Sequence, residues 1–101
     1  MHTTTIATHA PTPAQCERLD WLFHGNQMQS WYTLYAAVRG RYFADLALAV
    51  HIGRTEAQLE NCQRWEKESL CPWLWQDVGA GFQAKLEALQ AVRDNTAAAA
   101  A

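Results

Sequence analysis

The residues from Leu48 to Cys62 read LAVHIGRTEAQLENC, and they decide how many helices the middle of the chain forms. Apolar residues recur at helical spacing on both sides of Gly53, and glycine commonly ends helices. Thr55 followed three residues later by Gln58 has the spacing of a capping box, in which each side chain bonds the backbone N–H of the other residue. The stretch therefore predicts that one helix ends at Gly53 and that another begins near Glu56.

Upstream of this stretch, a first helix is predicted over residues 13–24. Thr12 can cap it with its hydroxyl, and Gln15 is placed to cap back. Gly25 should provide a left-handed stop, and Asn26 should cap a second helix. The inward stripe expected on that second helix consists of Met28, Trp31, Tyr35, Val38 and Tyr42.

The glycines leave alternatives open. At Gly40 the chain either breaks or continues as one helix to His51, because glycine costs about 1 kcal/mol against alanine inside a helix. The helix from Glu56 should end near Pro72 and carry Leu59, Cys62 and Leu70 toward the core. A last helix should follow with a kink or restart at Gly79 and Gly81. Its inward stripe consists of Trp75, Val78, Phe82, Leu86, Leu89 and Val92.

No segment alternates apolar and polar residues as a strand does, so the predicted class is all-α, a compact bundle of four to five helices. With 101 residues, the chain has room for one core. The predicted organisation is a disordered leader over residues 1–11, a helical domain over 12–95 and an alanine tail over 96–101.

Composition limits the classes of function. The formal net charge is -2, and neither the basic nor the acidic residues form a long block in the sequence. The composition therefore does not indicate a nonspecific phosphate-binding surface. No apolar run approaches the roughly 20 residues that a membrane span needs, and the N-terminus lacks a secretory pattern. We therefore expect a cytoplasmic protein that does not contact membranes. The odd number of cysteines, three, favours buried free thiols over a disulfide framework.

Ala49, Gly53, Leu59 and Cys62 occupy the crossing, turn and inward positions of a known motif. Over residues 45–64 the sequence resembles the helix-turn-helix of small DNA-binding regulators. No family is identified for the whole chain. The resemblance implies a DNA-binding alternative, in which the contacts to DNA come from Arg54, Thr55, Asn61 and Arg64, with added charge from Arg39 and Arg41. In a plainer interpretation, Gly53 only joins two packed helices.

The five tryptophans are the largest departure from ordinary composition. On a helical wheel of the first helix, Trp21 lies opposite the apolar side and close to Arg18. Trp73 and Trp75 are about 200° apart on a helix, so one face cannot bury both. Trp65 stands off the inward stripe of its helix. Arg18, Trp21, Trp65, Trp73 and Trp75 are therefore the predicted partner-binding residues.

Chemistry-bearing motifs are weak by comparison. Cys16, Asp20 and His24 follow one side of the first helix, but no paired-ligand spacing accompanies them, so we predict no metal and no cofactor. In that interpretation Cys16 belongs to the core. No nucleophile is visibly partnered with a base, and we predict no catalytic residues and no enzyme.

The sequence therefore predicts a non-enzymatic helical protein that binds another macromolecule. A protein partner is favoured and a homodimer is an alternative, while nucleic acid ranks lower because Glu56 and Glu60 would face phosphates. In size and composition the chain is similar to phage and mobile-element inhibitors of host nucleic-acid machinery, such as anti-CRISPR proteins.

Overall fold

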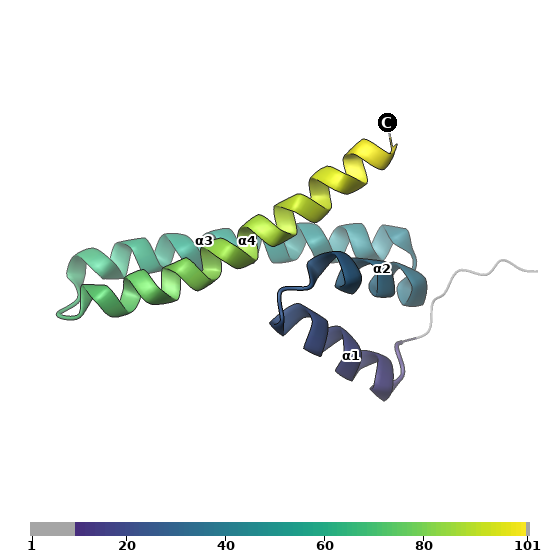
Figure 1. The fold of residues 1–101 in the computed structure, drawn as a ribbon, viewed down its shortest axis with the longest axis horizontal. Coiled ribbons are helices and arrows are strands. Elements are labelled where there is room, and N and C mark those ends of the chain that lie inside the picture. Colours follow the sequence, from purple (N-terminus) through teal and green to yellow (C-terminus); the bar gives the residue numbers. More distant parts are fainter. Residues whose placement is uncertain (1–9, 101) are drawn as a thin grey trace, which may run out of the picture. The chain divides into compact units, whose positions relative to one another are not determined.

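The computed structural model describes residues 10–100, and this part of the chain forms four α-helices and no strand. They are α1 (Pro13–His24), α2 (Met28–Arg39), α3 (Arg41–Glu68) and α4 (Pro72–Ala100), shown in Figure 1. The predicted all-α class is confirmed. Among the described helices none combines the length and the apolar character that a membrane crossing requires.

The chain divides into two compact units, Met1–Leu48 and Ala49–Ala101, and the division falls inside α3. Apart from Ala10 and Pro11, the predicted leader lies outside the described residues. The alanine tail continues α4 as far as Ala100. The single domain predicted for residues 12–95 stays a prediction.

The start of α1 confirms the predicted capping box. The Thr12 hydroxyl accepts from the Gln15 backbone N–H at 3.2 Å, and the Gln15 side chain accepts from the Thr12 N–H at 2.8 Å. The predicted end differs, because Gly25 has a φ of −82° and Asn26 takes the left-handed conformation with a φ of 56°. Asparagine tolerates that conformation better than most residues. Asn26 is therefore not the cap of α2, which begins after Gln27 without a side-chain cap.

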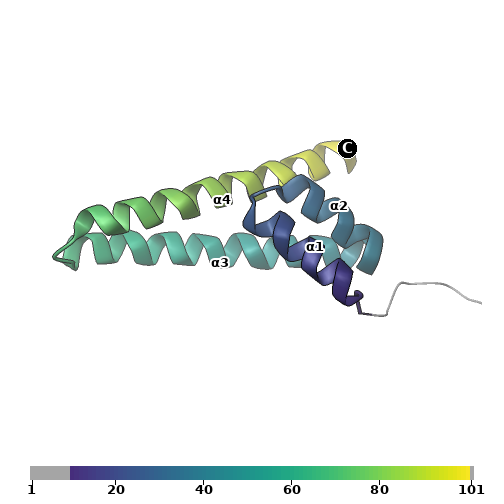
Figure 2. The same ribbon diagram turned by 60° about the horizontal axis from the view of Figure 1, so that its bottom comes forward.

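Packing in the first unit centres on Trp31, which is 3% exposed. Its ring contacts Phe23 of α1 and Tyr35 of α2, with ring centroids 5.4 and 5.5 Å away. Helices α1 and α2 pack against each other, as the two views in Figures 1 and 2 show. A hydrogen bond from the Tyr32 hydroxyl to the Asp45 carboxylate joins α2 to the start of α3. Other buried residues of this unit are Leu19, Leu22, Met28, Val38, Ala44 and Leu48.

Gly40 breaks the chain, which settles one of the open alternatives. Its φ of 96° lies in the region that favours glycine, and it separates α2 from α3. The break also corrects the inward stripe predicted for α2. Tyr42 lies beyond it, on the new helix, and is 73% exposed. Residues three or four positions apart share one face of a helix only while the helix is uninterrupted.

The predicted turn at Gly53 is wrong, because α3 runs without interruption from Arg41 to Glu68. Thr55 does not cap a new helix, and its hydroxyl donates to the His51 carbonyl at 2.7 Å, one turn earlier in the same helix. One internal glycine costs about 1 kcal/mol. Ending the helix would leave several backbone carbonyls and N–H groups without helical partners, which is the larger cost.

A substitution at Gly53 distinguishes a continuous helix from a turn. Nothing lies within 4 Å of a Cβ added at this position. Gly53→Ala should therefore raise the free energy of unfolding by about 0.5–1 kcal/mol, measured by urea denaturation, because alanine is the better helix former. Gly40→Ala is the matched comparison and should lower stability, because φ there is 96°. A Gly53→Ala protein less stable than the parent would contradict the continuous helix.

The second unit is a helical hairpin made of the later part of α3 and α4. Figure 1 shows α3 reversing direction after Glu68 and returning as α4. Gly79 is buried where the helices approach, and a Cβ there would lie 3.7 Å from Cys62 Cβ and 3.8 Å from Leu59 Cδ1. Helix α4 continues through Gly79 and Gly81, so neither glycine restarts it. The other buried side chains are Ile52, Thr55, Cys62, Leu86, Leu89 and Val92.

Two core assignments in this unit are corrected. Leu70 is fully exposed because α3 ends at Glu68 and places it in the connection. Val78 is 37% exposed, near the start of α4. The cysteine prediction holds in part. All three thiols are free, but only Cys62 is buried, while Cys16 and Cys71 are exposed.

His51 of α3 has a shifted pKa. Partial burial lowers the pKa of its imidazole below the usual value of 6.5, and the positive charges of Arg54 and Lys85 add to the effect. The imidazole is therefore neutral at pH 7. The folded state binds this proton less readily than the unfolded chain. The contribution of His51 to the protein's free energy of unfolding therefore falls as the pH drops below about 6.5.

Candidate functional site

Four of the five tryptophans are not needed to fill a core. Trp31 is buried, whereas Trp21, Trp65 and Trp73 are 58%, 45% and 62% exposed and Trp75 is half-buried. The four that are not buried are the tryptophans predicted to bind a partner. Exposed indole rings are rarely useful to the stability of a small protein, so these rings mark the candidate site.

The predicted residues fall into two groups. Arg18 and Trp21 belong to α1 in the first unit, where the guanidinium carbon lies 4.8 Å from the centre of the indole ring. Trp65, Trp73 and Trp75 belong to the second unit. Trp65 of α3 and Trp75 of α4 touch each other, with ring centroids 4.9 Å apart and planes inclined by 61°.

The connection between α3 and α4 positions the second group. The Ser69 N–H donates to the Trp65 carbonyl at 2.9 Å, and the Ser69 hydroxyl accepts from the Cys71 N–H at 3.0 Å. Pro72 then occupies the first position of α4, where its missing N–H costs nothing. This short connection brings the end of α3 and the start of α4 together.

Most of the large exposed apolar side chains of the second unit lie around this connection, and Val50, 48% exposed, lies away from it on α3. We call those around the connection the hairpin-end surface, which consists of Trp65, Leu70, Trp73, Leu74 and Val78 with the half-buried Trp75. The sequence interpretation identified its tryptophans but placed Leu70 and Val78 in the core and did not single out Leu74. Helical spacing carried no signal for Val78, because it lies eleven residues, close to three full turns, before Leu89 and so shares that residue's side of the helix.

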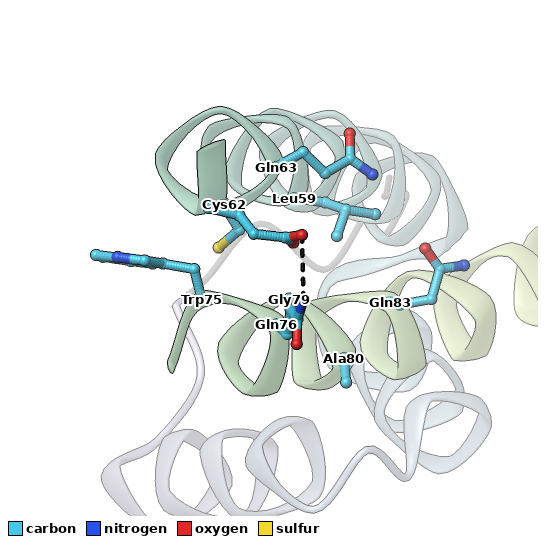
Figure 3. A pocket seen from close by; sticks show the side chains of 9 residues that line it. Leu59, Cys62, Gln63, Trp75, Gln76, Gly79, Ala80 and Gln83 are labelled. Atoms are coloured by element: carbon cyan, nitrogen blue, oxygen red, sulfur yellow. Dashed lines mark hydrogen bonds between the residues drawn. The ribbon is translucent and has the colours of Figure 1, made fainter. Parts of the chain in front are cut away.

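A crevice of about 240 Å³ lies where α3 meets α4, and Figure 3 shows it from close by. Leu59 and Cys62 of α3 point toward Gly79 of α4. The Gln76 amide donates to the Glu66 carboxylate at 3.3 Å across the crevice, drawn as the dashed line. This bond joins the two helices beside Trp75 and turns the Glu66 carboxylate toward the crevice.

A second, open pocket of about 440 Å³ lies at the end of the hairpin. It is lined by Trp65, Glu68, Ser69 and Trp75. Trp75 also lines the crevice and is therefore common to the two hollows. Its lining residues are two tryptophans, one serine and one glutamate, a combination that can hold a positively charged group.

The residues of the DNA-binding alternative do not form a reading head. Because α3 is continuous, the helix-turn-helix lacks its turn, and no separate recognition helix exists in residues 45–64. Thr55 is buried and bonded within the helix. Asn61 is half-buried, and Arg54 and Arg64 are exposed on the same helix.

The two arginines expected to add charge are engaged locally within the first unit. The Arg39 guanidinium lies 5.1 Å from the centre of the Phe43 ring. Arg41 is paired with Asp45 at 3.9 Å. The backbone thus removes the geometry on which the helix-turn-helix interpretation depended.

Over residues 10–100, no group of three or more histidine, cysteine, aspartate or glutamate side chains is placed to hold a metal ion. Cys16 and His24 of the first helix also have other contacts. The Cys16 thiol lies 3.9 Å from the Pro11 carbonyl, and His24 Nδ1 lies 2.8 Å from the Asp20 carbonyl.

Comparison with protein-family models, with curated proteins and with solved structures gave no match.

Proposed function

We propose that the protein acts without catalysis, by binding a partner protein through the hairpin-end surface. The observation that carries this proposal is the group of large apolar side chains left exposed around the α3–α4 connection, with Trp73 at 62% and Leu70 at 100%. Burying this apolar area against a partner would stabilise the complex through the hydrophobic effect, because folding of the chain alone leaves the area in contact with water.

The charges beside the surface indicate what kind of partner would fit. Between Trp65 and Val78 the chain carries three carboxylates, Glu66, Glu68 and Asp77, against one ammonium group, that of Lys67. A partner with an apolar cleft and a basic rim would complement this end of the hairpin. Trp73 is the side chain best placed to act as an anchor, because hot spots are enriched in tryptophan.

Within this class of function, the specific role that we propose is an inhibitor of nucleic-acid machinery, of the anti-CRISPR kind. It rests on the small size, the acidic net charge and the absence of a catalytic motif. Cleavage of DNA by a panel of purified RNA-guided nucleases is the direct test. Full cleavage by every nuclease at excess inhibitor would contradict this role and would leave partner binding to be judged separately.

Binding is tested with one pair of matched variants and an anchor variant. Leu74 and Leu46 are leucines of similar exposure, 43% and 49%, and only Leu74 belongs to the hairpin-end surface. A protein captured by the wild-type chain is purified, and its affinity for each variant is measured by titration calorimetry. Trp73→Ser should weaken binding by roughly 30-fold or more and Leu74→Ser by about tenfold, whereas Leu46→Ser should stay within about twofold.

Equal affinity of all three variants would place the contact elsewhere. Trp21→Ser then tests the alternative surface on α1, which would replace the hairpin end if binding were lost there. Sedimentation of the purified chain tests a second copy as the partner. A dimer that dissociates in Trp73→Ser but not in Leu46→Ser would show that this surface joins two copies of the chain.

A further inference from the structure

We infer that the pocket between Trp65, Trp75 and Glu68 binds a cationic side chain, lysine or arginine, presented by the partner protein. The inference rests on the proposed function and assigns one chemical group of the partner to one pocket. Three features of the hairpin end favour a positive charge at this place.

The first feature is the pair of indole rings. Their centroids lie 4.9 Å apart and their planes are inclined by 61°, so the rings stand as two walls at a corner. The face of an indole ring carries negative electrostatic potential and attracts a cation within about 6 Å of its centre. Both tryptophans line the open pocket, so a cation entering it can approach the face of an indole ring.

The second feature is the Glu68 carboxylate. It lines the same pocket, whereas the neighbouring Glu66 bonds Gln76 in the crevice. Glu68 is exposed, and an exposed ion pair alone contributes little. Beside two aromatic walls, however, the carboxylate selects a cation over an apolar group of the same size.

The third feature is the end of α3. Residues 65–68 form the last turn of this helix, whose final carbonyl groups carry the negative end of the helix dipole. The dipole of α3 favours positive charge beside the last turn, and the positive N-terminal end of α4, where Trp75 lies, offsets part of this effect. The dipole of α3 acts on the same space as Glu68, because both belong to the turn that lines the pocket.

The pocket is also suited to an external ligand. None of its four lining residues is a lysine or arginine, so within the described chain no internal cation forms part of its wall. The pocket is open to solvent, so a lysine or arginine side chain can reach it from outside. The stem of lysine or arginine can lie along the indole rings while the charge approaches Glu68.

The test uses small probes and does not need the partner. Nα-acetyl-arginine amide, Nα-acetyl-lysine amide and the uncharged Nα-acetyl-norleucine amide are titrated into the ¹⁵N-labelled full chain. The indole N–H resonances of Trp65 and Trp75 should shift with the cations, while that of the buried Trp31 should not. At least one cation should bind about fivefold more tightly than norleucine amide. Equal or tighter binding of norleucine amide would overturn the inference.

Two acidic residues two positions apart provide the control. Glu68→Gln should weaken cation binding by about fivefold and leave norleucine amide unchanged. Glu66→Gln removes the same charge from the same turn but outside the pocket, and should stay within about twofold. An equal loss in both variants would show attraction to the general acidity of the hairpin end and would overturn the assignment to the pocket.

Failure of this inference can be told apart from failure of the proposed function. If the probes show no preference for cations while Trp73→Ser still loses the partner, the pocket assignment is wrong and partner binding stands. If the cation preference is present but Trp73→Ser binds the partner normally, the hairpin-end surface is wrong as the docking site.

Discussion

Replacing Trp31 by alanine is expected to lower the free energy of unfolding by about 3–5 kcal/mol. The Trp31 side chain is 3% exposed and contacts aromatic rings of both α1 and α2. Its removal takes away the largest buried side chain of the first unit and leaves a cavity between helices that pack against each other. A loss of this size approaches the whole stability of many small proteins, about 5–15 kcal/mol.

Urea denaturation followed by far-ultraviolet circular dichroism measures this loss without relying on the deleted fluorophore. The matched control is Trp21→Ala, which removes the same side chain from an exposed site on α1 beside Arg18. Its effect should stay within about 0.5–1 kcal/mol. Equal destabilisation by both variants would mean that the division between structural and surface tryptophans is wrong.

The second large effect is expected in the hairpin. Leu89 is fully buried on α4, and Leu89→Ala should cost about 2–5 kcal/mol through lost apolar burial and the cavity left behind. Leu70→Ala deletes the same atoms from a fully exposed position and should change stability by no more than about 0.5 kcal/mol.

Hydrogen exchange of the backbone amides of α4 reports on this unit directly. Protection should fall in Leu89→Ala and should be unchanged in Leu70→Ala. Loss of protection in Leu70→Ala would show that the connection contributes to folding and would weaken its proposed use in binding. Together, the two pairs separate side chains that hold the protein together from side chains that remain available to a partner.

The difference between the buried tryptophan and the exposed ones indicates which side chains are available to a partner. If all five indole rings of this 101-residue chain were buried in its core, no tryptophan would be exposed to anchor a partner protein. Here one ring stabilises the fold, and three of the others surround a short connection in the second unit. The proposed binding surface is therefore expected to tolerate substitution without loss of the fold, which makes the binding experiments interpretable.

Local interactions made parts of the fold predictable. The capping box of Thr12 and Gln15 and the bounds of α1 depend only on neighbouring residues, and they were predicted correctly. The Gly53 turn was not, although Thr55 and Gln58 have the same spacing. A capping box and an uninterrupted helix use the same residue types, and the choice between them depends on what the flanking helical turns pack against.

The candidate site shows the same limit. Helical spacing indicated that Trp73 and Trp75 could not share one buried face, and that Trp21 and Trp65 stood away from the apolar stripes. Spacing could not show that Trp65 and Trp75 would touch, because they belong to different helices. Nor could it place Leu70 outside the core, because its position depends on where α3 ends.

By itself, the sequence determined the all-α class, the first helix and which tryptophans a single helical face could not hide. These follow from the period of the α-helix and from contacts between residues three or four positions apart. Only the tertiary structure decided that α3 continues through Gly53 and that the hairpin brings two indole rings and the Glu68 carboxylate to one pocket. Those features depend on packing between segments distant in the chain, which local spacing does not encode.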